Sequence, residues 1–421
     1  MDAYYDTRYK YNNPGVTFSL SGYSGALPIT IQNMPEQQTG AIYGSGDGSF
    51  VLANYGRESA AGPVKGLNGS SSSVFITRNQ AYVFAASQLS HVLTVVDNAV
   101  GTSYALNLPG VYRVSVNPGG SAALAFVQNS DYVYYPLKLN AAQTLAYSGG
   151  PTSWPKAAVD CEPQNAPAWC LFQAQSPDAV DGTGTTYGAP LAFDRPVKAV
   201  FSNDGGTAYL LNCGAECGGT ASSVSLLPVG PMIFTANQQS GKLPTNATIT
   251  KIAIPGGASN ALIDSSTMYV AGQQMLPDSL FTGNLTVVNL ANNTAGTPVP
   301  ISDGAPGAMS RMIEADDSTL WIGMTKCTNG ERYAKGLAYG CLTMFNTASG
   351  KVMTILPYQG DATGIAAVTS LHKVYVAEGG QVYVYSTKDG TAYNNQYVTV
   401  TGTAYDVAYM DGLSDANNTV Y

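Results

Sequence analysis

A short motif recurs along the chain and constrains the fold more than any other feature. Each copy is a tight turn that contains Gly or Pro, followed by a run of small apolar residues, as in LPG-VYRVSV and YQG-DATGIAAV. Self-similarity of this kind is typical of repeat architectures. The copies begin at Leu67, Leu108, Asp194, Ile254, Ser302, Tyr358 and Val400.

Most copies are followed by further short apolar runs, separated by Gly, Asn, Asp, Ser and Pro. In the first repeat these runs are QAYVFAA, HVLTVVD and SYALNLP. Runs of this length and composition are typical of β-strands. Four antiparallel strands in each of seven repeats predict an all-β fold, a seven-bladed β-propeller. Small residues suit the crowded innermost strands, whereas Val, Tyr and Phe suit the faces where neighbouring blades pack.

The last repeat is incomplete, because after TAYDVAYM the sequence leaves room for only one more strand, NNTVY. We therefore expect N- and C-terminal strands to share one blade and close the ring, which would leave no open edge. GSFVLANYG and GPVKGL are the N-terminal candidates. On this interpretation residues 41–421 form the propeller. Residues 1–40, which are rich in Tyr, form an arm that lies across the ring or is exchanged with a neighbouring chain.

The cysteines and the N-terminus bear on the compartment. We expect three local disulfides, because six cysteines permit 15 connectivities but each of these pairs flanks a polar loop. One pair lies in a long insertion at residues 139–191, within the second repeat. The alternatives are a metal site, which lacks the C-x-x-C spacing or nearby His that zinc needs, and free buried thiols. Disulfides indicate an oxidising compartment. The start of the chain has no apolar signal-peptide core, which fits either a cytosolic protein or a mature or trimmed form of an exported one. The six cysteines favour the exported protein. The expected pairs are Cys161 with Cys170, Cys213 with Cys217, and Cys327 with Cys341.

The low charge content and the lack of long apolar runs limit what this chain can bind or cross. Charged residues make up 11% of the chain, with 19 Lys and Arg against 27 Asp and Glu. There is no basic excess that could neutralise phosphates, so we expect no nucleic-acid partner. No run of about 18 apolar residues is present, so we expect no transmembrane helix. Abundant Tyr offers flat contact area, and sparse charge weakens the repulsion that keeps proteins apart. These features favour self-association through the N-terminal arm, or contact with polysaccharide.

Three carboxylates are candidate binding residues. Asp303, Asp361 and Asp406 fall near the first strand of three consecutive repeats. If these junctions share one face, the carboxylates would surround the mouth of the channel and attract a cation or a sugar. The alternative is turn chemistry, in which Asp accepts backbone hydrogen bonds. The segment from Asp178 to Gly188 has the composition of a calcium loop but lacks the ligand spacing of an EF-hand. We expect no other cofactor.

We assign no catalytic residue. Glu314, Asp316 and Asp317 are interpreted as a solvated turn cluster rather than a glycosidase pair. His91 and His372 are interpreted as turn or strand-edge residues rather than bases. No G-x-S-x-G elbow is present. Five N-x-[ST] sequons would carry glycans only on a eukaryotic secretory route; they lie at Asn68, Asn246, Asn284, Asn292 and Asn417.

The repeat pattern resembles the YVTN-type propeller of secreted bacterial proteins. From about residue 189 to the C-terminus, segments such as FDRPVKAVFSNDGGTAYLLNCGAECGGT, SRMIEADDSTLWIGMTKCTNGERY and VYVAEGGQVYVYS resemble a set of large exported propeller proteins. That set is frequent in acidobacterial genomes and is often described as lipoproteins. The resemblance implies a seven-bladed propeller and export, and it implies no reaction.

Three classes of function follow, and the fold alone does not choose among them. We favour a non-enzymatic extracellular or cell-surface protein that acts as a structural, adhesive or self-assembling subunit, such as that of a filament. The first alternative is a carbohydrate- or peptide-binding module on the propeller face. The second is an enzyme resembling a hydrolase or lactonase.

Overall fold

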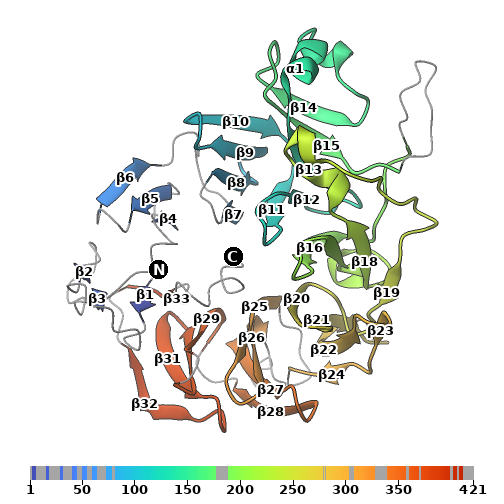
Figure 1. Ribbon diagram of the computed structural model, residues 1–421. Helices are drawn as coiled ribbons and strands as arrows, with labels where there is room; N and C mark the ends of the chain where they lie inside the picture. Colours follow the sequence, from blue (N-terminus) through green and yellow to red (C-terminus); the bar gives the residue numbers. More distant parts are fainter. Residues whose placement is uncertain are drawn as a thin grey trace. The chain divides into compact units, whose positions relative to one another are not determined.

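The computed structural model describes most of the chain from Ser73 to Met410 and, before that, the backbone of short strands. The described ranges after residue 72 are 73–77, 81–176, 188–277, 279, 281–302, 308–327, 339–356, 360–368, 371–398, 402–404 and 407–410. Some strand residues within them, such as 394–397 and 408–410, are described by their backbone alone. The chain divides into two compact units, Gln38–Ala253 with Tyr421, and Ile254–Val420 with Met1–Gln37. Figure 1 labels most of the strands of both units and colours them along the sequence.

The Gln38–Ala253 unit is built from antiparallel sheets that follow one another along the chain. The first has three strands, β4 (Gly40–Gly44), β5 (Phe50–Asn54) and β6 (Ser59–Pro63). The second has four, β7 (Ser73–Ile76), β8 (Tyr82–Ser87), β9 (Val92–Asp97) and β10 (Thr102–Asn107). The last is β16 (Pro196–Phe201), β17 (Thr207–Asn212), β18 (Ser223–Pro228) and β19 (Lys251–Ala253). Short 3₁₀ turns accompany it at Gly214–Cys217, Gly230–Met232 and Ala236–Gln238.

The predicted insertion completes the sheet between these two. Its strand order is β11 (Val111–Val116), β12 (Ala123–Val127), β13 (Val133–Lys138), β15 (Trp169–Gln173) and β14 (Ala158–Glu162). The insertion therefore supplies the fourth strand and a fifth. Before them come helix α1 (Ala141–Tyr147) and a 3₁₀ turn at Pro151–Ser153. Asn140 and Gln143 form a capping box at the start of α1. Asp160 accepts a hydrogen bond from the Asn107 amide at 2.6 Å and so ties β14 to β10.

The Ile254–Val420 unit repeats the same plan. Its sheets are β20 (Asn260–Asp264), β21 (Thr267–Met275) and β22 (Phe281–Asn289) with the short β23 (Thr294–Ala295) and β24 (Val299–Pro300); β25 (Ala308–Ala315), β26 (Thr319–Cys327), β27 (Tyr339–Asn346) and β28 (Lys351–Leu356); and β29 (Ala362–Val368), β30 (Lys373–Glu378), β31 (Gln381–Ser386) and β32 (Ala392–Val398). The smaller sheets are the hairpin β2 (Val16–Phe18) and β3 (Ile29–Ile31), and a parallel pair, β1 (Asp2–Tyr5) with β33 (Val407–Met410).

The predicted all-β class and the four-stranded antiparallel sheets are confirmed, and every first strand expected after a junction is present. One fourth strand differs. After β22 the chain makes two separate two-residue contacts, β23 and β24, instead of one continuous strand. Pro298 and Pro300 lie in this stretch, and proline cannot donate to a ladder.

The prediction for the strands that join the last repeat needs correction. β5 contains most of GSFVLANYG, but it pairs with its sequence neighbours β4 and β6, since short connections bring consecutive strands together. The N-terminal strand that pairs with β33 is β1. The segment NNTVY lies outside the described residues.

Within each unit the cores lie between successive sheets. In the Gln38–Ala253 unit, Phe84 and Leu93 pack in one cluster with Val114 and Trp169 of the following sheet. In the Ile254–Val420 unit, Trp321 packs with apolar residues of β29 and β30. Fully burying one such side chain contributes about 1.5–3 kcal/mol. The large apolar side chains of the middle strands therefore hold neighbouring sheets together. In the described part of the chain, no helix has the length and apolar character that crossing a membrane requires.

Candidate functional site

The polar groups with the most distinctive surroundings lie between the sheets β25–β28 and β29–β32 of the Ile254–Val420 unit. The first strand of the second sheet, β29, contacts β25 and β26 of the first. Two polar centres occur at this interface. One joins three turns at one end of the sheets, and the other is a single carboxylate inside the packed core.

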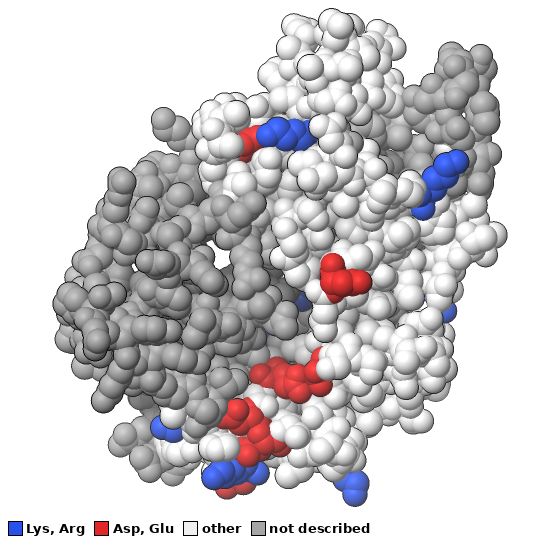
Figure 2. All heavy atoms as spheres, in the orientation of Figure 1, with Lys and Arg blue, Asp and Glu red and all other residues white. Residues whose placement is uncertain are grey.

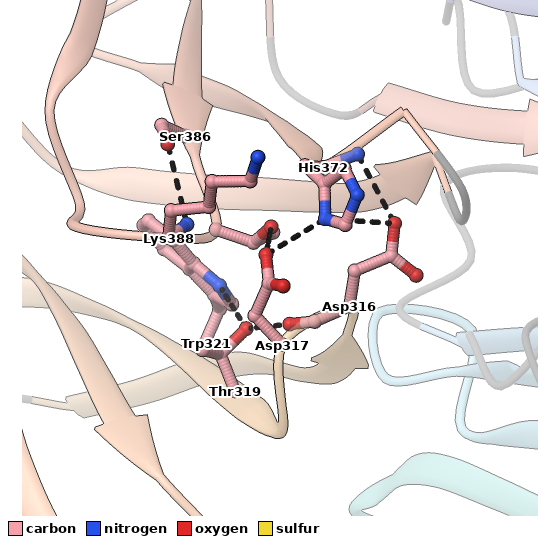
Figure 3. A network of polar contacts seen from close by, with 8 residues as sticks. Asp316, Asp317, Thr319, Trp321, His372, Ser386 and Lys388 are labelled. Carbon is pink, nitrogen blue, oxygen red and sulfur yellow. Dashed lines mark hydrogen bonds and ion pairs between the residues drawn. The ribbon is translucent and has the colours of Figure 1, made fainter.

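The first centre starts from tight turns that demand unusual backbone angles. Asp317 and Ser318, between β25 and β26, have φ values of 62° and 53°, and His372, just before β30, has a φ of 55°. Non-glycine residues rarely adopt this left-handed region, although Asp and His do so more often than most. These turns project Asp316, Asp317 and His372 toward one another, as Figure 3 shows.

Asp317 is the centre of this network. Its Oδ2 accepts a hydrogen bond from Thr387 Oγ1 at 2.6 Å and lies 2.8 Å from His372 Nδ1. The neighbouring Asp316 accepts a bond from the His372 backbone amide at 3.1 Å. The hydrogen bond from Thr387 and the contacts with His372 and Lys388 lower the pKa of Asp317 below its usual value. The network therefore joins turns of both sheets.

A second chain of hydrogen bonds connects the turns to the core. Thr319 Oγ1 donates to the Asp316 carbonyl at 2.7 Å and accepts from Trp321 Nε1 at 3.1 Å. Trp321 is fully buried, so its indole N–H needs such a partner. The buried Trp321 therefore holds the turn at Asp316 in place through Thr319.

The network orients an imidazole. With Asp317 at Nδ1, the His372 ring is held in one direction, and 41% of the side chain is exposed. Among the described residues, no three His, Cys, Asp or Glu side chains gather as a metal site. The sequence predicts turns at Asp317 and at His372 but gives no signal that the two side chains, 55 positions apart, are in contact.

The second centre is Glu378, at the end of β30. It has no exposed surface, yet only one of its oxygens has a partner: Oε2 accepts from the Tyr385 hydroxyl at 2.7 Å, whereas Oε1 has none. Burial raises the pKa of Glu378 to about 7, against the opposing effect of the Tyr385 bond. Burial also raises the pKa of Tyr385. Nothing in the sequence around Glu378 singles it out from other charged residues that precede a turn.

Of the three carboxylates predicted at the channel mouth, the structure describes Asp361. It precedes β29 at the end of the sheet where Glu378 lies, and its carbonyl accepts the Gly379 amide at 3.1 Å. Gly340 allows β27 to approach closely, since a Cβ there would lie 2.3 Å from the Asp361 Cα. Asp303 and Asp406 lie outside the described residues, as does the proposed calcium loop from Asp178 up to its final Gly188. The third acid of the predicted turn cluster, Glu314, is half-buried, and its pKa is raised by burial and by Asp264.

Two predicted disulfides are present. Cys161 pairs with Cys170 across β14 and β15, and Cys213 pairs with Cys217. Cys341 is also disulfide-bonded, while the side chain of Cys327 is not described. The disulfides indicate an oxidising environment.

The sequons differ in their surroundings. Asn284 is 3% exposed and its amide donates to Gln274 at 3.2 Å, so it does not face solvent in the folded chain. Asn292 is exposed in the turn before β23. Asn246 uses its side chain to bond to Ala192 and Pro190. Asn68 and Asn417 lie outside the described residues.

The described residues on the face shown in Figure 2 are mostly uncharged. Lys, Arg, Asp and Glu form small separate groups among uncharged residues. This distribution agrees with the 11% of charged residues in the sequence.

No protein-family model and no curated protein matches the sequence. Solved structures with a similar course of the chain include the hydrazine synthase of Kuenenia stuttgartiensis, with 14% identity over 79% of this chain and 86% of that chain, and a TM-score of 0.49. A second is the periplasmic gluconolactonase PpgL of Pseudomonas aeruginosa, with 11% identity over 85% and 92% and a TM-score of 0.48. A third is the β-propeller domain of Myceliophteria thermophila Cps50 (Swd1), with 10% identity over 84% and 91% and a TM-score of 0.43. Similarity at this level transfers no activity to this chain.

Proposed function

We propose that this chain is an exported seven-bladed β-propeller that acts as a non-enzymatic structural subunit and associates with further copies through its N-terminal strand. Support for the propeller comes from the recurring junctions and from the same strand order in successive sheets of each unit. Support for export comes from the disulfides at Cys161–Cys170 and Cys213–Cys217.

The observation that carries the proposed association is the pairing of β1 with β33. The two strands run parallel, with Asp2 opposite Val407 and Tyr5 opposite Met410. An extended segment that adds to a sheet by main-chain hydrogen bonds is a general mode of recognition. The same segment of a second copy offers the same hydrogen bonds, and exchange of an identical element is a low-cost route to oligomers. If the exchange does not close on itself, it generates a filament.

The surface composition supports the same proposal. A protein with 11% charged residues and a formal charge of −8 has little long-range repulsion for its size. The N-terminal segment is also rich in Tyr, which provides contact area at low entropic cost.

Cysteine cross-linking between separate chains tests the exchange. One preparation carries Ala3→Cys and the other Ala408→Cys, two positions that are Cα partners in the β1–β33 ladder. Paired strands bring Cα atoms within the range that a disulfide needs. After mixing and mild oxidation, we expect a covalent heterodimer on a non-reducing gel. A control mixture pairs Ala3→Cys with Ser349→Cys, an exposed turn residue, and should give no heterodimer above background.

The double variant Ala3→Cys/Ala408→Cys and a deletion of residues 1–33 complete the test. If the double variant forms only an intramolecular cross-link and the mixed chains form no heterodimer, β1 pairs within its own chain and the proposed association is wrong. The same conclusion follows if light scattering gives the same monomer mass for the full chain and the deletion variant.

A further inference from the structure

Glu378 lies on the face of β30 that packs against the neighbouring sheet. Side chains two apart along a strand share one face, so Val374, Val376 and Glu378 point the same way. Val374 and Val376 belong to the buried cluster that contains Trp321 and Leu342 of the sheet β25–β28. The carboxylate therefore enters an apolar layer between two sheets.

The surroundings of Glu378 offer little to stabilise a negative charge. Tyr385 on β31 donates the one hydrogen bond, at 2.7 Å, and its ring centroid lies 5.9 Å from that of Trp321. Other described titratable groups of the two sheets include Lys373 and Tyr375, on β30 itself; Tyr383, on β31; Tyr393, on β32; Asp361, before β29; Arg311 and Glu314, on β25; and Lys351, on β28. The Tyr385 bond is the contact that favours the charged form of Glu378, and it acts against the effect of burial.

We propose that Glu378 is a buried proton-binding site that makes the packing of the sheet β29–β32 against the sheet β25–β28 dependent on pH. In the protonated form, the carboxyl group carries no charge into the apolar layer. In the ionised form, a charge with one hydrogen bond and one unpartnered oxygen remains between the sheets, and burying such a charge is costly.

The direction of the effect follows from linkage. The pKa of Glu378 is raised from 4.5 to about 7 in the folded chain, so the folded state binds the proton more tightly than the unfolded state does. The stabilisation is complete below about pH 4.5, is lost as the pH rises toward about 7, and is absent above it. A rise in the pKa of Glu378 from 4.5 to about 7 corresponds to a factor of about 300 in the equilibrium constant for local opening of the sheet β29–β32.

Infrared difference spectroscopy detects the proton directly. We expect the wild-type chain to lose the carbonyl band of one buried protonated carboxylic acid between about pH 6 and about pH 8, and Glu378→Gln to lack this change. The conservative variant keeps an oxygen that can accept from Tyr385. Glu216→Gln, the same substitution at a residue of the other unit, should leave the titration unchanged.

If Glu378→Gln does not fold, the variant Tyr385→Phe provides the test. Tyr385→Phe removes the hydrogen bond that favours the ionised form, so the midpoint of the titration should move to higher pH. Protection of the β29–β31 amides against hydrogen exchange, corrected for the intrinsic rate, should fall by up to about 300-fold between about pH 4.5 and about pH 8.5 in the wild type. Exchange protection of β16–β18 should change far less.

The proposal is overturned if wild type and Glu378→Gln show the same infrared titration, or if Tyr385→Phe leaves the midpoint in place. It is also overturned if the protection of β29–β31 changes no more with pH than that of β16–β18. None of these measurements depends on whether the chain self-associates.

Discussion

Many acidic side chains of the described residues serve the turns in which they lie. Asp204 accepts hydrogen bonds from Ser202 and from the Gly206 amide, and Asp389 accepts two from Thr391. These bonds lower the pKa of both carboxyls. Asp194 likewise accepts the amides of Thr220 and Ala221. The turn chemistry weighed for Asp303, Asp361 and Asp406 is therefore common in this chain.

The Asp317 network leads to a prediction about the contact between turns. Thr387→Val keeps the shape of a buried side chain but removes the 2.6 Å bond to Asp317. We expect a loss of about 1 kcal/mol in the free energy of unfolding, the usual contribution of such a bond. Because the pKa of Asp317 is lowered from 3.8, this contribution is present above about pH 3.8 and is lost as the pH falls through the folded value.

A double-mutant cycle with Asp317→Ala, followed by urea unfolding, measures the interaction between Asp317 and Thr387. If the two changes are additive near neutral pH, Thr387 and Asp317 do not stabilise each other and the assigned contact has no energetic weight.

The ion pair between Asp97 and Lys138 leads to a second prediction. Asp97 is 1% exposed, and the Lys138 Nζ lies 2.6 Å from its Oδ2. Lys138→Met would leave a buried carboxylate without its cation, which typically costs about 3 kcal/mol. Asp97→Asn combined with Lys138→Met removes the charge as well and should restore most of the loss in urea unfolding. Equal stability of the wild type and Lys138→Met would contradict this role.

At the scale of strands and turns, the sequence predicts most of the fold. Each of the seven junctions, from the one at Leu67 onward, leads into a strand, because each combines a turn residue with a run of small apolar side chains. The length of the segment and its cysteines predict an insertion. That the insertion supplies the fourth and fifth strands of the sheet β11–β15 depends on the register between β13 and β15. That register, Leu137 opposite Cys170, is set by packing between distant segments.

The candidate site was much harder to predict. Asp317 and His372 lie in different repeats, and no local pattern relates the two turns. Glu378 ends the strand KVYVAE, where a charged residue normally marks the exit into solvent. Glu378 is buried because β30 packs against the sheet β25–β28, and this contact cannot be inferred from the sequence of one repeat. The incomplete last repeat predicts that an N-terminal strand pairs with the C-terminal one, but no sequence signal singles out β1 as that strand.

The inserted hairpin gives a prediction at the scale of the element. Cys161 and Cys170 close a short loop between β14 and β15, and a bridge of this loop length contributes about 2–3 kcal/mol. Replacing both cysteines with Ala should destabilise the hairpin selectively. Hydrogen exchange should show lost protection in β14 and retained protection in β16–β18. Equal losses in both regions would mean that the bridge supports the whole unit rather than the hairpin.

At the scale of the whole molecule, the low charge limits the kinds of contact through which copies would associate as proposed. Lys and Arg total 19 and Asp and Glu total 27 among 421 residues, so few ion pairs are available at any contact between chains. Contacts made of strand pairing and Tyr side chains depend on backbone hydrogen bonds and apolar area. Salt screens exposed charges over about 10 Å at 0.1 M. It has little effect on backbone hydrogen bonds or on the burial of apolar area.

The final prediction follows from this difference. If copies associate as proposed, raising NaCl from about 0.05 M to about 1 M should leave the oligomer mass unchanged or increase it, because screening removes the residual repulsion of a −8 chain. Mild urea should dissociate the oligomer, since it solvates both peptide and apolar groups. Sedimentation velocity across the salt series measures both effects, with the 1–33 deletion as a control. Dissociation by salt alone would contradict the strand-mediated association, because it would show that charge pairs hold the copies together.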